Sequence, residues 1–241
     1  MLKLLLLFVI SFLPPVIYAI WIRNTEKYER EPWRAIFTAF LWGATVAIIA
    51  SIILEILLGI PVYATIHDYT AYSFILAVII APVVEEFTKP FALSLKVVKR
   101  ELDEIEDGFI YGAAAGLGFS ATENLFYAMG FISKGLLIFA ILVAIRTIGG
   151  CLLHASATAF TGYGYGKSLL QGKGLTAILP FFAMAIAAHS FYNFVISFEM
   201  LGGFIGIVIA ILFAISCIRY VRRRIKELDE KGEKNALNGV Y

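Results

Sequence analysis

Long apolar runs separated by short polar segments extend along almost the whole chain. Each run of about 20 residues is long enough to cross a hydrocarbon core of roughly 30 Å as a helix. The pattern predicts an all-α membrane bundle of about seven transmembrane helices, with spans near residues 2–22, 35–59, 71–95, 108–131, 135–165, 175–198 and 204–220. The first run resembles a secretory signal, but no small-residue cleavage site leads into a soluble domain, so we interpret it as a membrane span.

The runs predict one helix-bundle domain, residues 1–220, with its candidate chemistry in 71–198, and a charged cytoplasmic tail at 221–241. Lys and Arg concentrate in every second loop, which sets the orientation. By the positive-inside rule, the loops that begin at Arg23, Lys96 and Lys167 face the cytoplasm with the C-terminal tail, and the N-terminus faces outward. We therefore expect a multi-pass protein of the cell membrane, surrounded by the lipid bilayer.

The composition excludes an ordinary soluble domain. Hydrophobic residues make up 60% of the 241 residues and charged residues only 16%, and the mean hydropathy is +0.84. The net charge of +2 is too small to indicate a nucleic-acid partner, so none is expected. Cys151 and Cys217 both lie within apolar runs and form neither a disulfide framework nor a paired zinc-ligand spacing.

Besides Lys3 and Arg219 at the ends of the first and last spans, six charged residues lie inside the predicted spans. Near the bilayer centre an ionised side chain costs at least about 2.5 to 3.5 kcal/mol, so a functional site is the default hypothesis for such residues. We interpret Arg146 as extending to the outer interface, although it can instead contact a substrate carboxylate or complete a polar network. The six are Glu55, Glu85, Glu86, Lys89, Glu123 and Arg146.

The third span carries two adjacent acids and a lysine. Lys89 lies one helical turn from both carboxylates, at i+4 from Glu85 and i+3 from Glu86, so one acid can pair with the ammonium while the other stays free. Pro90 has no N–H to donate to Glu86, which predicts an irregular helix with a polar backbone group beside the acids. The alternative is a buried ion pair that only fixes helix packing.

The fourth span combines a carboxylate with a row of small residues. Phe119, Glu123 and Asn124 lie on this span, and a small residue recurs at every fourth position. We interpret the small residues as a face for close helix packing, which does not explain Glu123. The row comprises Gly108, Gly112, Gly116 and Ser120.

Imidazoles follow on the next two spans. His154 lies on a small-residue face of the fifth span, and His189 and Asn193 share one face of the sixth. Counted at 1.5 Å per residue from the cytoplasmic flanks, Glu85, Glu123 and both histidines lie roughly 16 to 24 Å into the membrane. The four spans are therefore predicted to contribute to one polar layer.

This set of groups is sufficient for peptide hydrolysis. A buried Glu beside a second acid can take a proton from water, and imidazole and carboxamide groups can hydrogen-bond the developing oxyanion. The sequence contains no nucleophile-elbow serine, no aspartate pair in the spans and no H-E-x-x-H motif. We predict water activation by glutamate without a cofactor, and zinc is the alternative, with four adequate ligands in Glu85, Glu123, His154 and His189.

Four motifs in order resemble the PrsW family of intramembrane proteases. They are Glu85-Glu86-x-x-Lys89, Phe119-x-x-x-Glu123-Asn124, the isolated His154 and His189-x-x-x-Asn193, each on its own span. The family resembles the CAAX prenyl endopeptidases and bacterial Abi proteins, which have a glutamate-based mechanism. Its members are implicated in site-1 cleavage of membrane-tethered anti-sigma factors, so the resemblance implies a membrane-anchored protein substrate.

The resemblance also implies roles for individual residues. Glu85 would be the base and Glu86 the partner of Lys89, whereas His154, His189 and Asn193 would position water and stabilise the oxyanion. Glu123 stands where some relatives place a histidine, and Asn193 where some members carry aspartate. Phe119, Asn124, Lys89 and Arg146 would support this catalytic set.

Two other functions fit part of the pattern. One is a non-catalytic scaffold that resembles the seven-span subunit of gamma-secretase, but the paired acids Glu85 and Glu86 favour an enzyme. The other is a proton- or cation-coupled transporter, which is supported by the intramembrane acids alone. Such transporters usually have an internal repeat, and inspection of this sequence shows none. The sequence does not indicate an oligomeric state.

Overall fold

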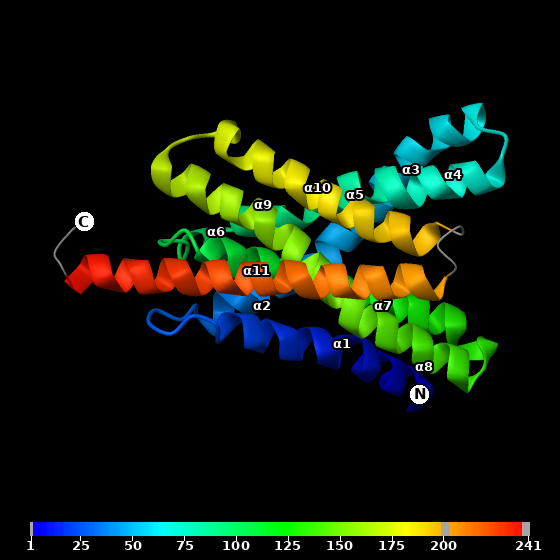
Figure 1. The fold of residues 1–241 in the computed structure, drawn as a ribbon, viewed down its shortest axis with the longest axis horizontal. Coiled ribbons are helices and arrows are strands. Elements are labelled where there is room, and N and C mark those ends of the chain that lie inside the picture. Colours follow the sequence, from blue (N-terminus) through cyan, green and yellow to red (C-terminus); the bar gives the residue numbers. More distant parts are fainter. Residues whose placement is uncertain (1, 199–202, 238–241) are drawn as a thin grey trace.

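The computed structural model describes residues 2–198 and 203–237, and every regular element in this part is helical (Figure 1). The all-α prediction is confirmed. Short π-helical turns (η1, η2, η5) and 3-10 turns (η3, η4) interrupt several of the helices. The elements are α1 (Leu2–Arg23), α2 (Trp33–Trp42), η1 (Gly43–Ala47), α3 (Ile48–Thr65), α4 (Tyr69–Ile75), η2 (Leu76–Ile80), α5 (Ala81–Thr88), η3 (Lys89–Ser94), α6 (Lys96–Lys99), α7 (Asp107–Phe131), η4 (Ile132–Lys134), α8 (Leu136–Ile145), η5 (Arg146–Gly150), α9 (Cys151–Gln171), α10 (Leu175–Ser197) and α11 (Phe204–Leu237).

Six continuous helical segments of the described chain are long and apolar enough to cross a membrane, which confirms a multi-pass membrane protein. α7, with 25 residues, is long enough but less apolar, and it is the most deeply buried helix of the bundle. The count of seven spans therefore stays a prediction. The six segments are Leu2–Arg23, Trp33–Thr65, Tyr69–Ser94, Leu136–Gln171, Leu175–Ser197 and Phe204–Asn235.

Small residues let α7 pack closely against helices on two of its faces. A Cβ atom built on Gly112 would lie 2.5 Å from the backbone oxygen of Thr158 on α9, and Gly108 and Gly116 face the same helix. On another face Gly118 meets the backbone of Phe40 on α2. The interpretation of the glycine row as a packing surface is confirmed.

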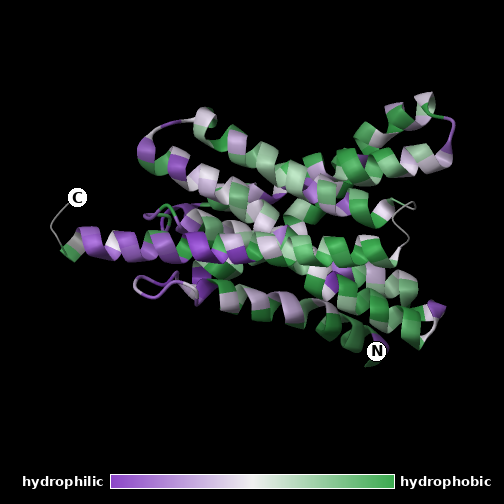
Figure 2. Cartoon of the chain, in the orientation of Figure 1, coloured by the Kyte–Doolittle hydropathy of each residue, from purple (hydrophilic) through white to green (hydrophobic). Residues whose placement is uncertain are grey.

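The charged loops gather at one end of the bundle (Figure 2). The α1–α2 loop, the segment before α7 and the turn between α9 and α10 lie there with the charged half of α11. The N-terminus lies at the opposite end of the long axis from the C-terminus, as an odd number of crossings requires (Figure 1). Which end faces the cytoplasm stays a prediction.

α11 continues through the domain boundary expected at residues 220/221. Val221, Ile225 and Asp229 are buried beyond that point, each with 3% exposure or less. The part of the tail up to Leu237 therefore extends the last helix of the bundle, and the domain division stays a prediction.

Candidate active site

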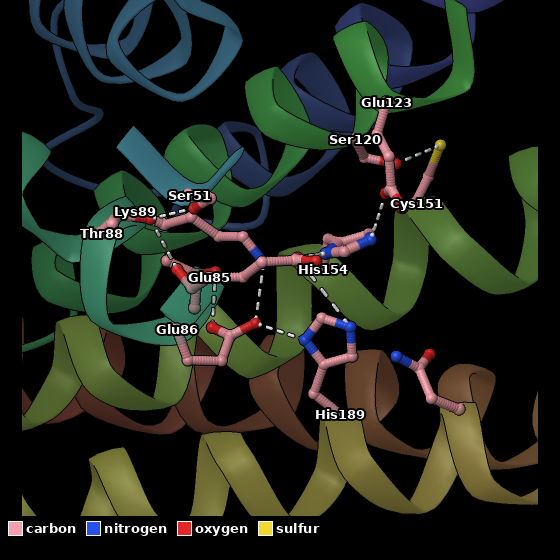
Figure 3. A network of polar contacts seen from close by, with 12 residues as sticks. Ser51, Glu85, Glu86, Thr88, Lys89, Ser120, Glu123, Cys151, His154 and His189 are labelled. Carbon is pink, nitrogen blue, oxygen red and sulfur yellow. Dashed lines mark hydrogen bonds and ion pairs between the residues drawn. The ribbon is translucent and has the colours of Figure 1, made fainter. Parts of the chain in front are cut away.

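Four helices place the predicted acids and imidazoles around one lysine (Figure 3). α5 carries both adjacent acids, and α7, α9 and α10 supply Glu123, His154 and His189. The helix changes from α to 3-10 at Lys89, just before Pro90, which is the irregularity that this proline predicts. Beside it, the backbone carbonyl of Thr88 accepts a hydrogen bond from Trp42 Nε1 at 3.2 Å.

Lys89 is the centre of the network. Its Nζ lies 2.9 Å from Glu85 Oε2, Glu86 Oε1 and His154 Nδ1, and its side chain is 0% exposed. Phe119 covers the ammonium with its ring centroid at 4.3 Å. An ammonium only donates, so His154 Nδ1 must accept, and this assigns the imidazole proton to Nε2.

The Nε2 proton of His154 points to Glu123. The distance from His154 Nε2 to Glu123 Oε2 is 2.8 Å, and the same carboxylate oxygen pairs with the guanidinium of Arg146. Arg146 Nε also donates to Asn124 Oδ1 at 2.8 Å. Glu123 thus orients His154 through the ring nitrogen that does not contact Lys89, and Arg146 neutralises Glu123.

The interpretation of Arg146 as extending to the outer interface is wrong. Its side chain is only 15% exposed and completes the polar network, which was the alternative considered above. Arg146 begins the π-helical turn η5, where the backbone widens and the helical spacing changes. This turn directs the guanidinium toward α7.

Glu86 is completely buried and well supplied with donors. Oε1 lies 2.9 Å from both Lys89 Nζ and His189 Nδ1, and Oε2 accepts the hydroxyl of Thr158 at 3.0 Å. The contact with a carboxylate assigns a proton to His189 Nδ1 and leaves the Nε2 lone pair free. Both oxygens of Glu86 therefore have hydrogen-bond partners, one of which is His189.

Glu85 differs from Glu86 in having an oxygen without a hydrogen bond. Its Oε2 is buried and, within the described residues, no hydrogen bond reaches it, because the nearby ammonium of Lys89 approaches outside hydrogen-bond geometry. The same oxygen lies 4.0 Å from the free Nε2 of His189. These two acceptor atoms are close enough for a single water molecule to bridge them.

Asn193 forms a hydrogen bond with the backbone of the segment before α5. Its Nδ2 donates to the backbone oxygen of Ala77 at 2.8 Å. Ala77 lies in the π-helical turn η2 that leads into α5. Asn193 therefore attaches α10 to the segment that positions the two acids, and its expected contact with an oxyanion stays a prediction.

Sequence reasoning missed the contribution of Thr158 to this site. Thr158 follows His154 by one turn of α9, and that spacing indicates a shared face without indicating a bond to Glu86. It also missed Ser51 on α3, whose hydroxyl lies 2.7 Å from that of Thr88. Single hydroxyl groups in apolar helices are too common to single out from a sequence.

An apolar groove reaches the network from one side. Its volume is about 330 Å³, and it extends between η3, α9 and α10 up to Glu86. Phe87, Phe91 and Phe182 line it. An apolar segment lying in this groove would end beside the acids.

Three of the residues could hold a metal ion. Glu85, His154 and His189 offer ligand atoms within 4.8 Å of one another, and two imidazoles with one carboxylate are donors that catalytic zinc uses. This set differs from the predicted one because Glu123 bonds the other nitrogen of His154, as the outer partner of a metal-bound histidine does. The donors fit zinc once Lys89 releases His154 Nδ1.

Comparison with known proteins gives one consistent result. A family model described as "PrsW family intramembrane metalloprotease" matches residues 31–218. Three similar proteins are each named Protease PrsW. The protein from Clostridioides difficile is 26% identical over 86% of this chain and 85% of its own length, and the one from Geobacillus kaustophilus is 27% identical over 78% of this chain and 79% of its own. The protein from Oceanobacillus iheyensis is 31% identical over 62% of this chain and 69% of its own. No solved structure gives a significant match.

Proposed function

The chain belongs to the PrsW family of intramembrane proteases, and from that premise we propose that it hydrolyses a peptide bond of a membrane-tethered protein with Glu85 as the general base. The observation that carries this proposal is the contrast between the two adjacent acids. Glu86 is bonded to Lys89, His189 and Thr158, whereas Glu85 Oε2 is buried without a hydrogen bond. Glu85, whose Oε2 has only the ion pair with Lys89 among the described residues, therefore has more unused acceptor capacity than Glu86, and we assign it the water proton.

The geometry suits a water molecule between Glu85 and His189. A water about 2.8 Å from each atom bridges the 4.0 Å between Glu85 Oε2 and His189 Nε2. Glu85 would accept one water proton, and the Nε2 lone pair of His189 would accept the other hydrogen and orient the oxygen. Both acceptors are held by groups behind them, so little reorganisation is needed.

The reaction then follows from these positions. The water oxygen forms a bond to the carbonyl carbon as its proton passes to Glu85, and the carbonyl oxygen becomes negative. The ammonium of Lys89, next to Glu85, stabilises that charge through space, and its burial strengthens the interaction. Glu85 returns the proton to the amide nitrogen as the C–N bond breaks.

The remaining groups hold the reacting ones in place. Glu123 fixes the tautomer and orientation of His154, whose Nδ1 receives Lys89. Because Arg146 neutralises Glu123, the network carries few uncompensated charges in the membrane. We assign these residues positioning roles.

The substrate would reach the acids from within the lipid. The apolar groove beside Glu86 accommodates hydrophobic side chains of a membrane-spanning or membrane-anchored segment. A tethered anti-sigma factor, cleaved at site 1, is the substrate that the family resemblance implies.

A metal-dependent version of the same activity has a specific observation in its favour. Glu85, His154 and His189 would hold the zinc ion, which when bound supplies a more acidic water and polarises the substrate carbonyl. In that case Lys89 would keep Glu86 as its partner and give up His154.

Purified protein reconstituted in vesicles with a panel of single-span proteins tests the proposal. We expect Glu85→Gln to reduce cleavage by about 10²- to 10⁴-fold, because the amide cannot accept the water proton. Glu86→Gln should also reduce cleavage through the orientation of His189, with a partial effect. Glu55→Gln on α3 is the matched control, since Glu55 is an intramembrane acid outside the hydrogen-bonded network.

Three outcomes are decisive. Undiminished cleavage by Glu85→Gln would remove the general-base assignment. Loss of wild-type activity in a zinc chelator and its return with zinc alone would establish the metal-dependent version. Equal losses in Glu55→Gln and Glu85→Gln would indicate a nonspecific effect of removing intramembrane charge.

A further inference from the structure

A second cluster of acids lies at the charged end of the bundle, away from the active site. Glu26 and Glu31 belong to the α1–α2 loop, and Asp107 is the first residue of α7. One carboxylate oxygen from each lies within 4.8 Å of the other two. The three residues are 0%, 4% and 1% exposed, so loop and helix bury them together.

These acids have no basic partner in residues 2–198 and 203–237. No ion pair within 4.0 Å joins them to Lys or Arg. The nearby guanidinium groups bond backbone instead: Arg23 Nε donates to the carbonyl of Glu31 at 2.5 Å and Arg30 Nε to that of Glu26 at 3.0 Å. The described chain therefore brings three carboxyl groups together without a basic side chain to pair with them.

One oxygen of the cluster has no partner at all among the described residues. Glu26 Oε2 accepts the N–H of Glu31 at 3.1 Å, whereas Glu26 Oε1 is buried and unbonded. A buried carboxylate oxygen left without a donor is costly unless another group binds it.

We propose that Glu26, Glu31 and Asp107 bind a hard divalent cation, Mg²⁺ or Ca²⁺. All three ligands are carboxylate oxygens, the donors that these ions prefer over the nitrogen and sulfur donors of zinc sites. Oxygens on opposite sides of Ca²⁺ are separated by about twice the bond length of 2.3 to 2.6 Å, which matches a cluster within 4.8 Å. Water would complete the coordination.

The surrounding contacts make this a structural site. The hydroxyl of Tyr111 on α7 donates to Glu31 Oε2, and Asp107 Oδ2 accepts the N–H groups of Asp103 and Glu104 at 2.9 and 2.6 Å. Asp229 on α11 accepts the N–H of Lys27 in the same loop at 2.9 Å. The cation would join the α1–α2 loop to α7 beside the contact that joins it to α11.

Direct binding to purified full-length protein tests the proposal. The protein is treated with a chelator in an uncharged detergent and then titrated with Mg²⁺ or Ca²⁺ by calorimetry and by thermal unfolding. We expect saturable binding of one ion and a higher Tm. Terbium, a hard cation with luminescence that a nearby tyrosine sensitises, should emit when the aromatic residues of the protein are excited, because Tyr111 lies against Glu31, and Mg²⁺ or Ca²⁺ should reduce this emission by competition.

The matched pair of variants is Glu26→Gln and Glu29→Gln, two glutamates of the same loop of which only the first belongs to the cluster. Glu26→Gln should weaken binding by more than about tenfold, and Glu29→Gln should leave it unchanged. Absence of binding by the wild type at millimolar Mg²⁺ and Ca²⁺, or equal binding by both variants, would overturn the proposal. Zinc content distinguishes this site from the active site, because Glu26→Gln should not change it.

Discussion

Replacing Lys89 by methionine should destabilise the protein and abolish cleavage. The ammonium is fully buried and lies 2.9 Å from three acceptors, so its removal leaves Glu85 and Glu86 facing each other in the membrane without a cation. Breaking a buried ion pair by removing one partner costs about 3 to 5 kcal/mol, mostly from the stranded charge. Methionine keeps the unbranched shape, so lost packing contributes little.

A second substitution separates charge from packing. Glu86→Gln added to Lys89→Met removes the stranded carboxylate, and we expect the double variant to be more stable than Lys89→Met alone by at least about 1 kcal/mol. The double variant should still not cleave substrate, because the ammonium of Lys89 remains absent. Lys167→Met on α9 is the control, since the ammonium of Lys167 lies about 6 Å from two aromatic rings and has no ion pair within the described residues.

Reversible unfolding in mixed detergent, followed by tryptophan fluorescence, measures these free energies. The reasoning is refuted if Lys89→Met is as stable as the wild type. It is equally refuted if the second substitution adds its own loss of stability without any recovery, since the charge would then not be the source of the cost.

Three further predictions concern the surroundings of the site. Gly112→Ala should lower the free energy of unfolding by about 1 to 3 kcal/mol and reduce cleavage, because the new Cβ meets the Thr158 backbone at 2.5 Å. Gly130→Ala in the same helix should be tolerated, because its Cβ has nothing within 4 Å. Equal effects of the two substitutions would contradict the packing of α7. Arg146→Met should reduce kcat by at least about tenfold, because Arg146 orients Glu123 and through it His154. Arg146→Lys should not restore kcat, because a single ammonium cannot bond both Glu123 and Asn124 as the guanidinium does. An unchanged kcat would show that Arg146 has no role in the network. Asn193→Ala should lower stability by about 0.5 to 1.5 kcal/mol, with little change in kcat, and a fall of about 10²- to 10³-fold in kcat would instead identify an oxyanion donor.

Much of the fold and part of the site follow from spacing alone. Runs of apolar residues predicted the helices because the bilayer requires a minimum length, and the glycine row predicted the close face of α7 because only small residues allow it. The acids and imidazoles were expected in one layer because depth can be counted at a fixed rise per residue. Their convergence on Lys89 agrees with that count.

The direction of individual side chains could not be predicted in the same way. Counting in steps of 3.6 residues assumes an uninterrupted α-helix, and the π-helical turns at 43–47, 76–80 and 146–150 break that assumption. Arg146 and Asn193 both owe their partners to such a turn, because Arg146 begins one and Ala77 lies in another. Helical spacing alone therefore could not predict which groups these two side chains contact.

The acid cluster of Glu26, Glu31 and Asp107 escaped sequence reasoning for a different reason. Asp107 is distant in sequence from the other two, and all three stand in segments rich in other charges, where acids are normally solvated. Only the packing of the α1–α2 loop against the start of α7 buries them together.

The modest hydrophobicity of α7 bears on how the chain is made. A translocon releases a segment into lipid according to its side chains, and a helix rich in glycine that also carries Asp107 and Glu123 is a poor candidate on its own. We expect α7 to be accessible to added protease in a chain that is truncated after residue 135 and released into membrane vesicles. In a chain truncated after residue 171, α7 should be protected. Membrane insertion of α7 would then depend on its packing against α9, because the bilayer alone does not retain this helix.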